Sequence, residues 1–111
     1  MSDLVESDRK KIEISARALT DLEEIWIYYS ERDQKIADKI LKQITEKFSK
    51  LLEFPKIGKE RNELFLGIRS FPAGKYIIFY QETDSGIEIT RVVHSSRDIP
   101  QIFDEMIPLE L

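Results

Sequence analysis

The strongest constraint on the fold comes from residues 66–98, where two turn sequences separate three short runs rich in Ile, Val, Tyr and Phe. The sequence Phe-Pro-Ala-Gly at 71–74 has proline second and glycine fourth, as a type I turn prefers. The sequence Thr-Asp-Ser-Gly at 83–86 is a second turn. The pattern predicts three antiparallel strands over residues 64–71, 75–81 and 87–94. In the middle run, side chains at both odd and even positions are apolar, which is typical of a central strand covered on both faces.

Two amphipathic helices are predicted before this meander. Residues 11–15 alternate apolar and polar side chains and predict a short strand that ends at Ser15, a suitable N-cap. From residue 16 onward, apolar side chains recur every three or four positions, as on one face of a helix. That face holds Leu19, Leu22, Trp26 and Tyr29, with Ala18 and Ile25 beside them.

The second helix is predicted to begin after Asp33, its N-cap, and to end before Pro55. Its apolar side chains step by four, at Ile36, Ile40, Ile44, Phe48 and Leu52. The short break at residues 30–33 predicts an antiparallel helical hairpin, and the sheet is the partner for its apolar face.

A short C-terminal helix is predicted after the last strand, with Ser95 or Ser96 as its N-cap. The apolar side of this helix includes Ile99, Ile102, Phe103 and Met106. The chain is therefore expected to be α+β, with an N-terminal strand, a helical hairpin packed on an antiparallel sheet, and a short terminal helix. At 111 residues it is expected to form a single domain over 1–111, with residues 1–10 as a frayed leader.

Composition argues against several classes of site. There is no cysteine and only one histidine, so neither a zinc site nor a cysteine nucleophile is expected, and the four glycines form no phosphate-binding loop. We therefore expect no cofactor and no metal. No apolar run approaches the roughly 20 residues of a membrane span, and the charged N-terminus does not resemble a signal peptide, so a cytoplasmic location is expected. The net charge of −4 argues against broad non-specific binding of nucleic acid. Direct sequence-specific binding of nucleic acid is not expected either.

The basic side chains in the sheet region are the candidate functional groups. Arg91 stands at alternate positions with Ile87, Ile89 and Val93, so it is predicted to lie on the same, otherwise apolar face of the strand. A guanidinium on such a face needs a partner. It either contacts a target or forms an ion pair with a carboxylate, from Asp98 or from a helix. Arg69 is either a functional cation or an ordinary exposed arginine. His94 has the alternative of a hydrogen-bonded structural residue.

Several segments, in their order and spacing, carry a resemblance to a known superfamily. They are Ala18 with Asp-Leu-Glu-Glu-Ile at 21–25, Pro-Lys-Ile-Gly at 55–58, Glu-Leu at 63–64, Leu-Gly-Ile-Arg at 66–69, Ile-Phe-Tyr at 78–80, Ile-Thr-Arg-Val-Val-His at 89–94, and Arg-Asp at 97–98. The chain resembles the toxins of type II toxin–antitoxin modules in the RelE/ParE superfamily, and the ParE branch in particular. The resemblance covers roughly residues 13–103, and it implies the same fold of a helical hairpin on an antiparallel sheet.

The resemblance implies growth inhibition by the toxin, plasmid stabilisation, and neutralisation by a cognate ParD-like antitoxin. ParE-like members act on DNA gyrase and stall it on cleaved DNA. RelE-like members cut mRNA in the ribosomal A site, using basic residues and often a tyrosine. Three hypotheses follow: a gyrase inhibitor, an mRNA endonuclease using Arg69, Arg91 and His94, and a non-toxic antitoxin-binding module. The acidic net charge and the lack of a basic cluster after the last strand favour the first.

The candidate site residues follow from this reading. Contacts with the cellular target are predicted for Arg69, Tyr80, Arg91, His94, Arg97 and Asp98. Contacts with the antitoxin are predicted for Trp26, Tyr29 and Phe65, with the alternative that each of them belongs to the core. We expect Arg91→Ala to lower toxicity more than Arg69→Ala, unless Arg91 is an internal ion-pair partner.

Overall fold

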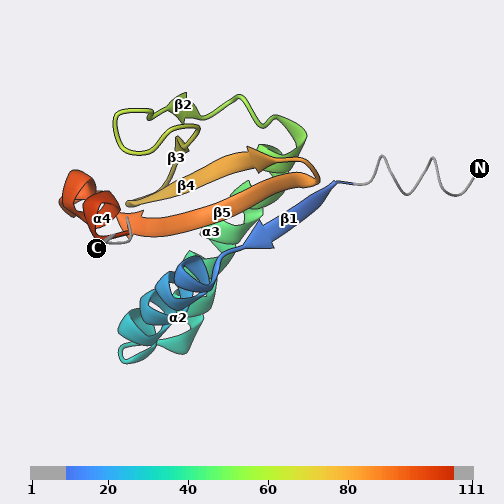
Figure 1. The fold of residues 1–111 in the computed structure, drawn as a ribbon. Coiled ribbons are helices and arrows are strands. Elements are labelled where there is room, and N and C mark those ends of the chain that lie inside the picture. The colour runs from blue at the N-terminus through green and yellow to red at the C-terminus, as the bar shows by residue number, and fades with distance from the viewer. Residues whose placement is uncertain (1–9, 107–111) are drawn as a thin grey trace, which may run out of the picture.

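The computed structural model describes residues 10–106 and contains one sheet and three helices (Figure 1). In chain order the elements are β1 (Lys11–Ile14), α2 (Ala16–Ser30), α3 (Gln34–Glu53), β2 (Lys59–Glu60), β3 (Arg69–Ala73), β4 (Tyr76–Thr83), β5 (Gly86–His94) and α4 (Ile99–Met106). This order confirms the expected α+β fold. The expected frayed leader lies outside the described residues, except for Lys10.

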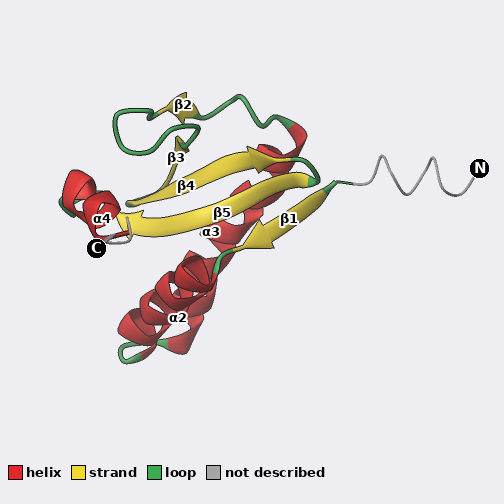
Figure 2. Ribbon diagram, in the orientation of Figure 1, coloured by secondary structure: helices red, strands yellow, loops and turns green. Residues whose placement is uncertain are grey.

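The sheet has five strands in the order β1-β5-β4-β3-β2. Strands β3, β4 and β5 form the predicted antiparallel meander. Strand β1 lies parallel to β5, with Ile12 opposite Ile87 and Ile14 opposite Ile89. The short strand β2, which the sequence did not indicate, pairs antiparallel with the start of β3. In Figure 2 the α2–α3 hairpin lies below and behind the sheet, and α4 lies at the end of β5.

Two apolar clusters cover the two faces of the sheet. The larger one joins the helical hairpin to the sheet and includes Leu22, Ile44, Phe48, Ile78 and Ile89. The smaller one joins α4 to the other face, where the rings of Phe79 and Phe103 lie 4.8 Å apart. Because Ile78 and Phe79 belong to different clusters, β4 is covered on both faces. This confirms the prediction for the middle strand and for the apolar side of α4.

The predicted strand over residues 64–71 is wrong at both ends. Residues 62–67 form turns and a bend, and β3 begins only at Arg69 and continues to Ala73. Pro72 is therefore a strand residue, and it lies opposite Ile77 of β4. Strand β2 pairs with Arg69 and Ser70 but does not extend to Pro72, so the proline lies at an edge of the sheet, where prolines in strands are usually found. The turn lies two residues later than predicted, over residues 73–76, with Gly74 at a φ of +63°.

The helix caps are partly as predicted. The Ser15 hydroxyl accepts from the Ala18 N–H at 3.0 Å, and the Asp33 carboxylate accepts from the Lys35 N–H at 2.7 Å. The prediction of Ser95 or Ser96 as the cap of α4 is wrong. Asp98 fills that position, and its carboxylate accepts from the Gln101 N–H at 3.2 Å.

The buried stripe of α2 is shifted from the predicted one. Ala18, Asp21, Leu22 and Ile25 are buried, whereas Leu19 is 48% exposed and Trp26 is half-buried. The apolar surface of α2 is thus wider than the core requires, and part of it faces outward.

Within residues 10–106, no helix is long and apolar enough to cross a membrane. The same part of the chain brings no three His, Asp or Glu side chains together in a way that could hold a metal ion.

Candidate functional site

A β-bulge changes the direction in which Arg91 points. Phe79 pairs with Arg91 and Tyr80 pairs with Ile89, so Thr90 is an extra residue in β5. One extra residue reverses the alternation of side chains along the strand. As a result Val92, rather than Arg91, joins Ile89 in the cluster under the helical hairpin. The prediction that the Arg91 side chain lies on the same face of the sheet as Ile87 and Ile89 is therefore wrong.

Arg91 forms a buried ion pair with Asp21 of α2. Its Nε donates to Asp21 Oδ2 at 2.8 Å and its Nη2 donates to Asp21 Oδ1 at 3.0 Å. The Val92 N–H also donates to Asp21 Oδ2, at 2.9 Å. The pairing of β1 with β5 ends at Ile89, so Asp21 accepts from an N–H that lies past the end of that pairing. The two side chains are 5% and 7% exposed. This geometry confirms the alternative that Arg91 pairs with a helix carboxylate, and it leaves the guanidinium inaccessible to a target.

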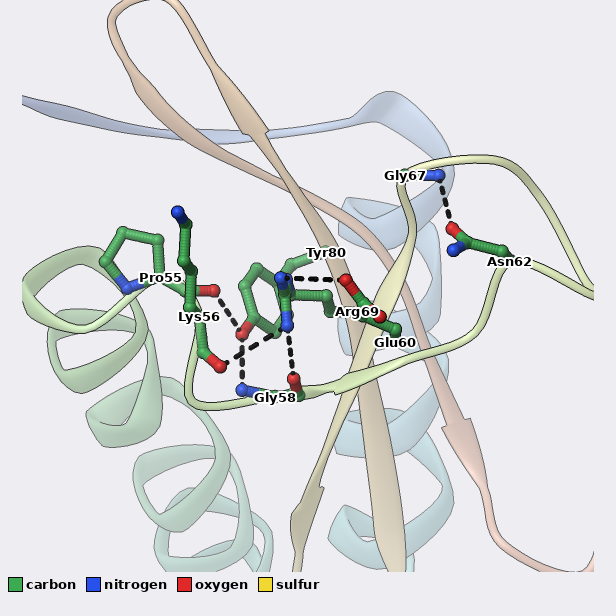
Figure 3. Close-up of polar contacts among 8 residues, drawn as sticks. All are labelled: Pro55, Lys56, Gly58, Glu60, Asn62, Gly67, Arg69 and Tyr80. Carbon is green, nitrogen blue, oxygen red and sulfur yellow. Dashed lines mark hydrogen bonds and ion pairs between the residues drawn. The ribbon is translucent and has the colours of Figure 1, made fainter.

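Tyr80 and Arg69 together anchor the connector between α3 and β2 (Figure 3). The fully buried Tyr80 hydroxyl donates to the Pro55 carbonyl at 2.7 Å and accepts from the Gly58 N–H at 2.8 Å. Arg69 Nη1 donates to the Gly58 carbonyl at 2.8 Å and to the Lys56 carbonyl at 3.3 Å. Burial raises the pKa of the Tyr80 phenol, although the hydrogen bond from Gly58 opposes this. Both candidates are therefore bound to the protein's own backbone.

Gly58 is required by this close approach. A Cβ at position 58 would lie 2.7 Å from Cε1 of Tyr80 and 2.9 Å from its Cζ, which is closer than real side chains come. The sequence Pro-Lys-Ile-Gly at 55–58 is thus the part of the connector that receives the Tyr80 ring.

His94, Arg97 and Asp98 lie at the carboxyl end of β5. The His94 Nδ1 accepts from the Ser96 N–H at 3.1 Å, and its ring contacts Tyr76 edge-on with centroids 5.3 Å apart. His94 and Arg97 line one cavity of about 170 Å³ together with Glu24 and Tyr28. Asp98 is occupied with capping α4.

The residues of the nuclease hypothesis do not converge. Arg69 pairs opposite Tyr80, and His94 pairs opposite Tyr76. These positions on β4 are four residues apart, which is roughly 13 Å along a strand. Arg91 is buried against Asp21. Two of the predicted target contacts, His94 and Arg97, line the same cavity.

An apolar groove of about 450 Å³ opens on the outer side of the helical hairpin, and we call it the hairpin groove. Its lining residues are Leu19, Leu22, Glu23, Trp26, Ile27 and Leu41. The indole of Trp26 is held in place by its Nε1–H, which donates to Asp38 Oδ1 at 2.8 Å.

The three predicted antitoxin contacts do not form one surface. Trp26 lines the hairpin groove. Tyr29 lines a different cavity of about 260 Å³ with Ile40 and Tyr76, and its hydroxyl accepts from the Tyr76 hydroxyl at 3.3 Å. Phe65 is 47% exposed on the turns between β2 and β3.

Sequence reasoning missed Asp21 as a partner and Leu19, Ile27 and Leu41 as lining residues of the groove. A signal existed for Asp21, because it is the one carboxylate within the apolar stripe that contains Ala18, Leu22 and Ile25. The sequence did not distinguish the exposed apolar residues of the groove from core residues, because both belong to the same apolar stripe of the helix.

Comparison with known proteins agrees with this architecture. Residues 12–99 match the model of a family described as the ParE toxin of the type II toxin–antitoxin system parDE. The chain is 32% identical over 90 residues to Toxin ParE1 of Mycobacterium tuberculosis (strain CDC 1551 / Oshkosh), covering 78% of this chain and 90% of that protein. It is 30% identical over 89 residues to Toxin ParE1 of Caulobacter vibrioides (strain ATCC 19089 / CIP 103742 / CB 15), covering 78% and 91%.

The fold is also similar to a chain in a solved structure of the chromosomal ParDE TA system from P. aeruginosa. The TM-score is 0.67 at 19% identity, and the match covers 77% of this chain and 95% of that one. The family match spans most of the chain, and the solved fold has the same arrangement of helices and sheet. The chain belongs to the ParE family of toxins from type II toxin–antitoxin systems.

Proposed function

We propose that this ParE-family toxin inhibits DNA gyrase, and that a cognate antitoxin neutralises it. Family membership supports a toxin role. The observation that carries the choice of a non-enzymatic action is the buried pair of Arg91 with Asp21. In the endonuclease hypothesis that arginine would have to face the RNA, whereas here it forms a buried ion pair that joins β5 to α2.

The mRNA endonuclease is the weaker candidate because its other groups are engaged as well. Phosphate stabilisation requires cations aimed at the developing charge, and Arg69 instead donates to backbone carbonyls of the connector. A general acid or base must reach the substrate, and the Tyr80 hydroxyl is fully buried between Pro55 and Gly58. His94 would have to act without either group nearby.

A supercoiling assay with purified gyrase tests the proposal directly. We expect the toxin to reduce supercoiling and to accumulate cleaved DNA that remains bound to gyrase. Unchanged supercoiling with no trapped cleavage complex would contradict it. Cleavage of translated transcripts during growth arrest would favour the endonuclease instead, and harmless expression would favour a non-toxic binding module.

We assign the hairpin groove to the antitoxin. The groove is lined by apolar side chains of both helices, and it is large enough to accept side chains of an amphipathic helix. Trp26 is already held by Asp38, so little ordering is required when a partner binds.

Co-expression with the product of an adjoining short open reading frame tests this assignment. We expect Leu19→Ser and Trp26→Ala to keep toxicity but to escape neutralisation. Full neutralisation of both variants would show that the antitoxin binds elsewhere.

A further inference from the structure

The turns between β2 and β3 present an exposed apolar tip, which we call the 65–66 tip. Leu66 is 82% exposed and Phe65 is 47% exposed. Among the exposed large hydrophobic side chains of residues 10–106, Leu66 is the most exposed. A single exposed leucine is ordinary on a protein surface. The question is whether the rest of the loop is built to present it.

The loop is held rigidly by its own hydrogen bonds. The N–H groups of Leu64 and Phe65 donate to the Arg61 carbonyl at 3.0 and 3.3 Å, and the Ile68 N–H donates to the Phe65 carbonyl at 3.1 Å. The Asn62 side chain accepts from the Gly67 N–H at 2.9 Å (Figure 3).

The base of the loop is also fixed to the core. Ile68 is buried and Leu64 is packed in the cluster beneath α4. The 65–66 tip is therefore presented in a fixed shape, and binding through it requires little further ordering of the chain.

The charge of the loop argues for a protein partner. Residues 62–68 carry one charged side chain, Glu63, and it is paired with Arg61 at 2.8 Å. That ion pair lowers the pKa of Glu63. Nucleic-acid binding depends on lysines and arginines that neutralise phosphates, and the tip has none. Large apolar side chains at the centre of protein interfaces instead fill desolvated pockets on the partner.

The tip is remote from the surface assigned to the antitoxin. In Figure 1 the β2–β3 turns lie at the top of the molecule, whereas the connection between α2 and α3 lies at the bottom. The groove residues come from α2 and α3, and none comes from residues 61–68. The two surfaces can therefore have separate partners.

We propose that the 65–66 tip is the part of the toxin that contacts its cellular target, with Leu66 and Phe65 entering an apolar pocket of a protein. The inference rests on the proposed function, in which the target is a protein, and it adds the contact by which the target is recognised. Gyrase is the target that the proposed function names. The predicted contact Phe65 thereby moves from the antitoxin to the target.

The test uses variants of the full chain that change only exposed side chains. Leu66→Ser and Phe65→Ser remove the apolar tip, and Leu66→Met keeps it. Ile36→Ser is the matched control, because Ile36 is 47% exposed like Phe65 and belongs to α3. Thermal unfolding of each variant checks that the fold is unchanged. Leu66→Lys serves as a second variant at that position if the serine lowers the unfolding midpoint.

The readouts are growth arrest without antitoxin and the toxin concentration that halves supercoiling by purified gyrase. We expect Leu66→Ser to require roughly 10- to 100-fold more protein, from the burial of one leucine side chain. Leu66→Met and Ile36→Ser should match the wild type. Undiminished arrest by both serine variants of the tip overturns the inference.

The two proposals can fail separately. If the wild type arrests growth without affecting gyrase or mRNA, and Leu66→Ser relieves the arrest, the tip contact stands and gyrase is the wrong target. If the arrest is accompanied by cleavage of translated mRNA, the partner is the ribosome, and the inference of an apolar protein pocket is overturned together with the gyrase proposal.

Discussion

At the scale of single residues, the Asp21–Arg91 pair shows how a charge can be essential to a protein without contacting any partner. Asp21 accepts three hydrogen bonds, two from Arg91 and one from the Val92 N–H. Removing one member leaves the other charge buried without compensation, which typically costs about 3–5 kcal/mol. We therefore expect Arg91→Ala and Asp21→Ala each to lose roughly that much unfolding free energy in urea denaturation.

The double variant Arg91→Met with Asp21→Leu is the control for this prediction. Because it removes both charges and keeps apolar volume, it should lose far less stability than either single variant. The expectation that Arg91→Ala lowers toxicity more than Arg69→Ala is then explained by unfolding. A stable, folded Arg91→Ala protein that has lost toxicity would instead return Arg91 to the target interface.

Tyr80 is a second residue whose role is structural. Tyr80→Phe leaves the Pro55 carbonyl without its donor and the Gly58 N–H without its acceptor. We expect a loss of about 1–3 kcal/mol in unfolding free energy, measured by urea denaturation. Gly58→Ala should also destabilise the fold, because its Cβ would meet the Tyr80 ring. The two effects should not add, since both act on one contact. Additive losses would show that the residues act independently.

At the scale of elements, the helices and the meander were predictable because their apolar periodicity extends over many residues. Helix α3 covers 20 residues and β5 covers nine, so one misplaced residue does not hide the pattern. Strand β2 has two residues, and a stretch that short carries no periodicity at all. The bulge at Thr90 is likewise invisible locally, because it depends on how β5 pairs with β4.

The same limit explains what could be predicted of the candidate site. The sequence indicated that Arg91 needs a partner, since a guanidinium among apolar residues must be paired. The partner was not identified as Asp21, which lies 70 residues away, although Asp21 is the one carboxylate within the apolar stripe of α2. Trp26 was identified as a possible contact. The hairpin groove around Trp26 was not predicted. The exposed and the buried apolar residues of α2 look alike in the sequence, and they differ only in what packs against them in the fold.

Gly67 offers a prediction about the loop as an element. Its φ of +87° is one that other residues rarely adopt, although a Cβ there would meet nothing within 4 Å. Gly67→Ala should therefore cost about 1 kcal/mol through backbone strain alone. It should also weaken growth arrest, because the loop must rearrange beside Leu66.

Gly74→Ala is the matched control. Gly74 has a φ of +63° and equally open surroundings, and it lies in the β3–β4 turn. It should cost similar stability in thermal unfolding and leave toxicity unchanged. Equal toxicity of the two variants would show that the shape of the 65–66 tip does not matter.

At the scale of the whole molecule, the sheet separates two exposed surfaces. The hairpin groove belongs to α2 and α3, and the 65–66 tip belongs to the turns between β2 and β3. The Arg91–Asp21 pair joins the sheet to α2, and the Tyr80–Gly58 contact joins it to the connector that leads into β2. The arginines and the tyrosine that resemble a catalytic set thus hold the framework on which both surfaces are presented.

The buried phenols predict how stability depends on pH. Burial raises the pKa of Tyr76, helped by its hydrogen bond with Tyr29, and burial also raises the pKa of Tyr80. In the unfolded chain both phenols ionise near pH 10, whereas the folded protein keeps them neutral to higher pH. Their contribution to stability is therefore fully present below about pH 10 and is lost as pH rises towards the folded values. Urea denaturation between pH 8 and pH 11, in steps of about half a unit, should show a falling unfolding free energy above pH 10. Tyr80→Phe should show a shallower fall, and an unchanged slope in that variant would contradict the assignment to Tyr80.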